Sequence, residues 1–226
     1  MTPTPLKTIF FDIGNTLLFP DRAHILKPLL ARGVTPSLEH WHAIERDTKR
    51  KFDDIVEHGG PADHGFWHMF YAQLLDDLQI KDDTLHASLV EATRISANWS
   101  DMRAGTCEAL QRIGTGYPLG VISNADGKVT AVLERSGIAQ CFRSITDSGV
   151  LGYEKPHPAI FEAALRTLKA EPQQSLYVGD VYSVDYLGAM RAGMQAMLFD
   201  VAGAYQDLGL PRVQSLQELE LKLTAR

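Results

Sequence analysis

The sequence is poor in cysteine and has no long apolar run. Its 226 residues include only two cysteines, Cys107 and Cys141, which are too few for a disulfide framework and lack the spacing of metal ligands. No run reaches the roughly 18 apolar residues that a membrane-spanning helix requires. The first residues also lack the basic and apolar regions of a signal peptide. We therefore expect two reduced thiols in a cytoplasmic protein.

The sequence also lacks any long block of like charge. The 22 lysines and arginines and the 28 aspartates and glutamates give a formal charge of −6. A net negative charge favours solubility and disfavours nonspecific binding to nucleic acid. The content of 45% hydrophobic and 22% charged residues is ordinary for a soluble globular protein. We expect a small-molecule partner, no nucleic-acid or membrane partner, and a monomer or a homodimer.

Short apolar runs with β-branched and aromatic members are typical of buried strands. Such runs occupy residues 8–13, 117–124, 175–180 and 196–200. Helical patterns lie between or beside them, at 126–137, 157–170 and 184–194. Because apolar strands that alternate with helices form parallel sheets, the pattern predicts an α/β fold. We expect a doubly wound parallel sheet of the Rossmann-like kind, with helices on both faces, and a C-cap at Gly137.

Residues 19–100 contain helical patterns and no strand-like run. The apolar positions with helical spacing are Leu38, Trp41, Ile44, Phe52 and Ile55, then Phe66, Phe70, Leu74 and Leu78, then Leu85, Leu89 and Ala92. This spacing predicts a bundle of about four helices, with the aromatic stripes in its core. We predict that 19–100 is an α-helical cap domain inserted into a core formed by 1–18 and 101–226.

Side chains that could carry chemistry follow the predicted strands. Reactive groups collect at the carboxyl ends of the strands in an open parallel sheet. The candidates at or just after such positions are Asp12, Ser123 with Asn124, Asp180 with Asp185, and Lys155 at the start of a helix. Each of them alone would be ordinary turn or capping chemistry. Their joint occurrence predicts one site at this edge of the sheet.

These residues stand in segments that resemble the motifs of the haloacid dehalogenase-type hydrolase superfamily. The segments FFDIGNTL, VISN, GYEKPHPAIF and YVGDVYSVDYLGA resemble its four motifs in their order. The last two are the most specific, and the likeness covers essentially the whole chain. The resemblance implies a hydrolase with a Rossmann-like core and a cap inserted after the first motif.

The resemblance also implies a role for each acidic residue. Asp12 would be the nucleophile that attacks phosphorus and forms an aspartyl-phosphate. Asp12, Asp180 and a dianionic phosphate bring about four negative charges together, which requires a counterion. Mg²⁺ suits this place because it prefers oxygen ligands. Asp180 would bind Mg²⁺ directly, whereas Asp185 would bind through water or hold Asp180 and Lys155.

The remaining implied roles concern the phosphoryl group and the first motif. Lys155 would add positive charge beside the phosphoryl oxygens and the nucleophile. The Ser123 hydroxyl and the Asn124 backbone N–H would donate hydrogen bonds to the transition state. The family's metal also binds the backbone carbonyl at the position of Gly14. Asn15 replaces the family's usual glycine, which asparagine tolerates because it enters left-handed conformations comparatively easily.

Gly14 stands where the family's phosphatases carry a second aspartate. That residue protonates the leaving group and then activates water, which is typically worth about 10² to 10⁴ in rate. Phenol and acyl phosphates need little protonation and would suffer least from its loss. Asp21, His24 or Glu154 could supply a proton instead. We predict that Gly14→Asp raises activity on poor leaving groups.

The favoured hypothesis is a Mg²⁺-dependent phosphatase of a small phosphorylated metabolite. One alternative is a dehalogenase. The two-carbon-acid dehalogenases of this family usually carry a tyrosine at the position of Gly14 and need no metal. The retained Asp180 and Asp185 therefore disfavour this alternative. Phosphonate hydrolases need a cap amine, for which Lys49 and Lys51 are candidates. The other alternative is a metal- and phosphate-binding regulator or interaction module with weak or no turnover.

Overall fold

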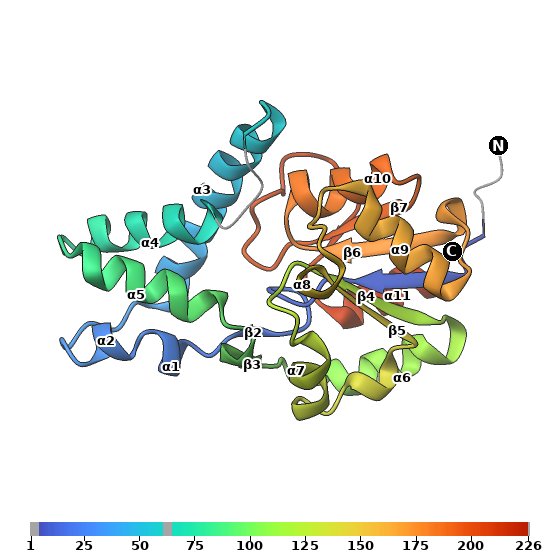
Figure 1. Cartoon of the computed structure of the whole chain (residues 1–226), viewed down its shortest axis with the longest axis horizontal. Helices are drawn as coiled ribbons and strands as arrows, with labels where there is room; N and C mark the ends of the chain where they lie inside the picture. The colour runs from blue at the N-terminus through green and yellow to red at the C-terminus, as the bar shows by residue number, and fades with distance from the viewer. Residues whose placement is uncertain (1–4, 61–64, 226) are drawn as a thin grey trace.

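The computed structural model describes residues 5–60 and 65–225, with a parallel sheet at its centre (Figure 1). Six strands form this sheet in the order β5-β4-β1-β6-β7-β8, and all neighbours run parallel. They are β1 (Thr8–Phe11), β4 (Leu119–Ser123), β5 (Ser144–Asp147), β6 (Ser175–Gly179), β7 (Gln195–Phe199) and β8 (Arg212–Val213). The sheet extends from β1 in both directions, which confirms the predicted doubly wound fold. The carboxyl end of β1 is therefore the place where such folds bind ligands.

Helices cover both faces of this sheet. They are α6 (Thr106–Gly116), α7 (Val129–Arg135), α8 (Ser148–Leu151), α9 (Pro158–Leu168), α10 (Leu187–Arg191) and α11 (Leu216–Thr224). Ile9 and Phe11 pack in one apolar cluster with side chains of α6, α7 and α11. Phe10 packs in another with side chains of α9 and α10. Because successive strand side chains alternate between two buried faces, the strands are continuous apolar runs in the sequence.

Most predicted core elements are confirmed, with two differences. The helices expected at 126–137 and 157–170 are α7 and α9, and Gly137 follows α7 with a left-handed φ of 69°. The helix expected at 184–194 begins instead with a π-helical turn, Tyr182–Tyr186, and continues as α10. Strands β5 and β8 and helices α6, α8 and α11 were not predicted; β5 has only one apolar residue among its four, and β8 has only two residues.

A helical segment leaves and re-enters the core through a pair of short strands. β2 (Phe19–Pro20) and β3 (Trp99–Asp101) pair antiparallel, so the two connections lie side by side. Between them lie α1 (Arg22–Ile25), α2 (Lys27–Leu30), α3 (Leu38–Glu57), α4 (Gly65–Asp77) and α5 (Asp83–Arg94). These helices lie beside the core, on the side toward which β1 points (Figure 1). The division into a core of 1–18 and 101–226 and a cap of 19–100 stays a prediction.

Helices α3, α4 and α5 share an apolar cluster that also includes side chains of α1 and α2 and Val184 of the π-helical turn. The stripe expected on α3 is buried at its centre, but Leu38 and Ile55 are exposed, so the prediction is wrong at both ends. Polar side chains of α3 are buried instead, at Glu45, Lys49 and Asp53. They face the core, which gives the helix a second buried side. In the described part of the chain, no helix combines the length and apolar character needed to cross a membrane.

Candidate active site

The predicted site residues meet at the carboxyl ends of three strands. Asp12 directly follows β1, Ser123 ends β4, and Asp180 directly follows β6. All seven predicted site residues line one cavity of about 580 Å³: Asp12, Gly14, Ser123, Asn124, Lys155, Asp180 and Asp185. Residues of α3, α4 and α5 line the same cavity, so it lies between the core and the helical segment. The structure thus brings the predicted residues together, while their individual roles stay predictions.

The Lys155 ammonium group lies at the centre of this site. Its Nζ donates to Asp12 Oδ1 at 2.7 Å, to Asp185 Oδ1 at 2.8 Å and to the Tyr177 hydroxyl at 2.8 Å. These three contacts match the three hydrogens of an ammonium group. Burial alone would lower the pKa of Lys155, but the Asp12 and Asp185 carboxylates hold it above its ordinary value. The lysine is therefore a fixed positive charge beside the expected nucleophile.

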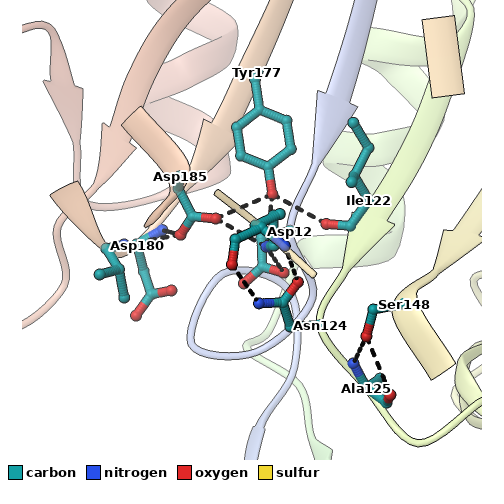
Figure 2. A network of polar contacts seen from close by, with 10 residues as sticks. Asp12, Ile122, Asn124, Ala125, Ser148, Tyr177, Asp180 and Asp185 are labelled. Carbon is teal, nitrogen blue, oxygen red and sulfur yellow. Dashed lines mark hydrogen bonds and ion pairs between the residues drawn. The ribbon is translucent and has the colours of Figure 1, made fainter. Parts of the chain in front are cut away.

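Asn124 positions Lys155 through its side chain. Its Oδ1 accepts from the Lys155 backbone N–H at 2.7 Å, and its Nδ2 donates to the Lys155 carbonyl at 3.0 Å. From the sequence, only the Asn124 backbone N–H was expected to contribute, so this positioning of Lys155 by the side chain was not predicted. The next residue is also fixed, because the Ala125 backbone N–H donates to Ser148 Oγ at 3.0 Å (Figure 2). The loop after β4 is therefore tied to both α8 and the lysine.

Tyr177 is a site residue that the sequence analysis missed. It lies on β6, and its hydroxyl accepts from Lys155 and lies 3.0 Å from the Ile122 carbonyl and 3.2 Å from Asp185 Oδ1 (Figure 2). Burial raises the pKa of the phenol well above its ordinary value, and the nearby Asp185 adds to this rise. The hydroxyl therefore stays protonated. A tyrosine in a predicted buried strand could have indicated this role, because a buried phenol usually has a hydrogen-bond partner.

Asp185 organises the loop that carries Asp180. One oxygen accepts from Lys155, and the other accepts from the backbone N–H groups of Asp180 at 3.0 Å and Val181 at 2.9 Å. The π-helical turn brings Asp185 back under the end of β6, where a Cβ on Gly179 would lie 2.6 Å from the Asp185 carboxyl carbon. Glycine is therefore required at this position. Both Asp185 oxygens are engaged, which fits the predicted holding role.

The acidic residues form a donor set that suits a hard cation. One carboxylate oxygen each of Asp12, Asp180 and Asp185 lies within 4.8 Å of the others, and all three residues are buried. Burial raises the pKa of the Asp12 and Asp180 carboxyls above their ordinary values, against the lowering effects of Lys155 and Lys49. A buried set of oxygen ligands with excess negative charge fits Mg²⁺.

The loop after β1 adopts the conformation that its sequence favours. Asn15 has a left-handed φ of 51°, as expected for the residue that replaces the family's usual glycine. The Asn15 backbone N–H donates to the Leu18 carbonyl at 2.9 Å, which closes the turn. Gly14 precedes it and lines the cavity beside Asp12. The expected contact of its carbonyl with a metal stays a prediction.

Lys49 brings a second positive charge into the site from the cap. Its Nζ lies 2.8 Å from Glu45 Oε1 and 2.8 Å from Asp180 Oδ2, and the residue is 0% exposed. Both contacts are ion pairs between buried side chains. Burial alone would lower the pKa of Lys49, but Asp180 and Glu45 raise it above its ordinary value. Schiff-base chemistry needs a neutral amine, so this geometry disfavours phosphonate hydrolysis; Lys51 is exposed.

Further polar contacts join α3 to the core beside Lys49. Asp53 accepts from the Ser183 backbone N–H and from the Tyr205 hydroxyl, both at 2.8 Å. Arg46 donates to the Ala202 carbonyl at 3.0 Å. Arg46 lies one turn before Lys49 and Asp53 one turn after it, so the three contacts lie on one side of α3. We call Lys49, Asp53 and Arg46 the α3 clasp, because they hold the cap helix against the core.

We predict that Lys49→Met destabilises the folded protein. The change leaves Glu45 and Asp180 buried without their shared cation, and breaking a buried ion pair in this way costs about 3–5 kcal/mol. Denaturant unfolding measures the loss of unfolding free energy. Lys51→Met on the exposed side of the same helix is the matched control, with an expected change within about 0.5 kcal/mol. Equal losses in the two variants would contradict a stabilising role for the Lys49 ion pairs.

The three proposed substitutes for the missing acid differ in position. Glu154 lines the cavity, whereas neither Asp21 nor His24 is among the described residues that do. Asp21 instead caps α1 and accepts from the His24 backbone N–H at 2.9 Å. Glu91 and Asp126 line the cavity as well and were not predicted.

Comparison with known proteins places the chain among hydrolases. A family model described as haloacid dehalogenase-like hydrolase matches residues 6–193. A glyceraldehyde 3-phosphate phosphatase from Methanothermobacter thermautotrophicus is 45% identical over 203 residues, covering 85% of each chain. A protein of the same name from Methanopyrus kandleri is 38% identical over 212 residues, covering 90% of this chain and 87% of the other.

Solved structures show the same fold at lower identity. The HAD-hydrolase YfnB from Bacillus subtilis, crystallised with magnesium, has a TM-score of 0.70 and 18% identity, covering 97% of this chain and 99% of the other. A HAD phosphatase from Thermococcus onnurineus has a TM-score of 0.61 and 24% identity, covering 96% of this chain and 98% of the other. These two likenesses concern the fold alone.

Proposed function

Because the chain belongs to the haloacid dehalogenase-like hydrolases and has relatives named as phosphatases, we propose that it is a Mg²⁺-dependent phosphatase of a small phosphorylated metabolite. The observation that carries this proposal is the group of Asp12, Asp180 and Asp185 beside Lys155 at the end of β1. A carboxylate held by a lysine, with further carboxylates within reach of a shared cation, suits attack on a phosphoryl group.

The proposed reaction passes through an aspartyl-phosphate on Asp12. The carboxylate attacks phosphorus, and the bond between phosphorus and the leaving oxygen breaks. Water then attacks the aspartyl-phosphate, which releases inorganic phosphate and restores Asp12. Lys155 keeps Asp12 oriented and balances its charge across the 2.7 Å contact. The Ser123 hydroxyl and the Asn124 backbone N–H would donate hydrogen bonds to the phosphoryl oxygens.

The residues that would hold Mg²⁺ are Asp12, Asp180 and the Gly14 carbonyl, with Asp185 behind them. When bound there, the ion would supply positive charge between the carboxylates and the phosphate. Asp185 contributes by fixing the backbone of Asp180 through the 3.0 Å hydrogen bond. The all-oxygen composition of the set supports Mg²⁺ over metals that prefer nitrogen or sulfur ligands.

The names of the relatives supply the first substrate to test. Glyceraldehyde 3-phosphate is the compound in the names of relatives that cover 85% and 90% of this chain. The wider panel contains aryl phosphates, other sugar phosphates, acetyl phosphate, phosphonoacetaldehyde and 2-haloacids. These compounds separate phosphatase, phosphonate hydrolase and dehalogenase activity.

We expect phosphate release from at least one phosphate ester of this panel, and removal of Mg²⁺ by chelation should lower it by about 10²-fold or more. Adding Mg²⁺ back should restore it, whereas Na⁺ at equal ionic strength should not. Phosphate or halide release serves as the readout. Halide release that ignores the chelator would overturn the proposal in favour of a dehalogenase. Tight Mg²⁺ binding without turnover of any substrate would overturn it in favour of a regulator.

A further inference from the structure

The cavity reaches well beyond the carboxylates into an aromatic region. Its volume of about 580 Å³ is in the range that accommodates drug-sized ligands and exceeds what a three-carbon phosphate would fill. Four aromatic residues line it: Phe52, Phe66, Trp67 and Trp99. The first three come from α3 and α4, and Trp99 comes from β3. We call these four residues the aromatic wall.

The rings of the aromatic wall contact one another in an unbroken series. The ring centroids of Phe52 and Phe66 are 5.8 Å apart, those of Phe66 and Trp67 are 4.9 Å apart, and those of Trp67 and Trp99 are 5.6 Å apart. All three pairs are edge-to-face. Trp99 is also fixed by its indole N–H, which donates to the Thr93 carbonyl at 2.7 Å. The wall is therefore pre-organised to bind a planar group.

Trp99 also explains the glycine of the first motif. A Cβ on Gly14 would lie 3.1 Å from the Trp99 ring, which is tighter than an ordinary contact. The indole therefore occupies the side of the loop from which a second aspartate would project. The absence of an acid at position 14 therefore allows the close approach of the Trp99 ring. The sequence-based expectation that Gly14→Asp alone raises activity neglected this contact.

Without a carboxyl group at position 14, the leaving oxygen is less readily protonated and departs with more anionic character. A phenol, with a pKa of roughly 10 as in tyrosine, loses its proton far more easily than an alcohol, whose pKa is several units higher. A phenolate is therefore the better leaving group, and its ring can pack against Trp67 and Trp99. The lack of a carboxyl group at Gly14 and the aromatic lining of the cavity both favour a phosphate ester of a phenol.

The charges around the cavity disfavour a second anionic group on the substrate. Arg94 lies 3.6 Å from Glu91, and Lys128 lies 3.9 Å from Asp126. Lys155 is engaged with Asp12. Each cation among the described cavity residues thus lies near a carboxylate, and Glu154 adds a further carboxylate to the lining, which favours a neutral leaving group over an anionic one.

We propose that the substrates are phosphate monoesters of phenols, with the ring of the leaving group bound against Trp67 and Trp99. This inference rests on the proposed phosphatase function. A bond forms between Asp12 and phosphorus, the bond to the phenolic oxygen breaks, and its electron pair leaves with the phenolate. Water hydrolyses the aspartyl-phosphate and releases one proton, and the phenolate takes up one proton from solvent. The products are a phenol and inorganic phosphate.

The test compares kcat/KM for phenyl and naphthyl phosphate, glyceraldehyde 3-phosphate and acetyl phosphate. We expect the aryl esters to exceed glyceraldehyde 3-phosphate by about 10²-fold or more. Acetyl phosphate has a good leaving group but no ring, so it separates ring binding from leaving-group acidity. Trp99→Leu and Trp67→Leu should each lower the ratio of phenyl to acetyl phosphate by about tenfold, mainly through KM for the aryl ester. Trp99→Phe should retain most of this ratio.

Tyr117→Leu is the matched control, because this partly buried aromatic residue lies before the amino end of β4. It should leave the ratio unchanged. Preference for glyceraldehyde 3-phosphate, or an unchanged ratio in both tryptophan variants, would overturn the aryl-ester proposal while the phosphatase function stands. No phosphate release from any of these substrates, acetyl phosphate included, would instead overturn the phosphatase function.

Gly14→Asp tests whether Trp99 fills the place of the proton donor. The single variant should gain little activity on glyceraldehyde 3-phosphate, because the new side chain meets the indole. The double variant Gly14→Asp with Trp99→Ala has room for the carboxyl group and should gain about 10²-fold over Trp99→Ala alone. An equal gain in the single variant would contradict the proposed role of Trp99.

Discussion

Asp12→Asn is expected to lower kcat by about 10⁴-fold or more, which is the order of effect seen when a covalent nucleophile is removed. The amide is nearly isosteric with the carboxyl group and its oxygen can still accept from Lys155, but it does not attack phosphorus. The loss should therefore appear in kcat with little change in the fold. Steady-state phosphate release measures it, and acid quenching during turnover should trap a hydroxylamine-sensitive acyl phosphate in the unmodified protein only.

Asp21→Asn provides the matched control for this prediction. Asp21 caps α1, and asparagine caps helices about equally well. It is not among the described residues that line the cavity, so the control should retain full activity. If Asp12→Asn kept activity within tenfold of the unmodified protein, Asp12 would not be the nucleophile.

Lys155→Met should have the next largest effect, a loss of about 10³-fold in kcat/KM. The change removes the ammonium group that lies 2.7 Å from Asp12 and 2.8 Å from Asp185, so the two carboxylates repel each other without compensation. Asp12, the proposed nucleophile, then takes up a proton more readily and becomes less reactive. Breaking the buried ion pair should also lower the unfolding free energy by about 3–5 kcal/mol. Kinetics and denaturant unfolding, both with Mg²⁺ present, measure the two losses.

Two further variants separate the charge of Lys155 from its surroundings. Tyr177→Phe removes one hydrogen-bond partner of the ammonium group and keeps the charge, so we expect a loss of less than about tenfold. Lys81→Met removes an exposed lysine from the cap and should change neither activity nor stability appreciably. If Tyr177→Phe lowered kcat/KM as much as Lys155→Met does, the position of the Lys155 ammonium group, and not its charge, would be the more important factor.

The fold was largely predictable because its strands are buried on both faces. Strands such as β1 and β6 therefore stand out as apolar runs, and their order alternates with helical patterns. β5 was not predicted because three of its four residues are polar, and β8 because it has only two residues. The predicted apolar stripe on α3 was wrong at its ends, Leu38 and Ile55, for a different reason. A single apolar stripe assumes one buried side, whereas α3 has two, and its second side is polar.

The site was predictable where its residues follow strands and unpredictable where they meet through tertiary packing. Asp12 and Asp180 are neighbours because β1 pairs directly with β6. The parallel pairing places both strand ends at one edge, so sequence position alone implies proximity. Lys49 reaches Asp180, and Trp99 reaches the cavity, only because of how the helical segment lies on the core. No local pattern in the sequence distinguishes them from the other lysines and tryptophans.

The α3 clasp has a consequence for how molecules enter and leave. Lys49 extends from the cap to Asp180, so any tilt of α3 that widens the mouth of the cavity also withdraws a positive charge from the acid cluster. The opening of the cavity and the electrostatic potential at Asp12 therefore both depend on the position of α3. A displacement of α3 relative to the core would therefore change the cavity lining at Phe52 and the charge beside Asp180 together.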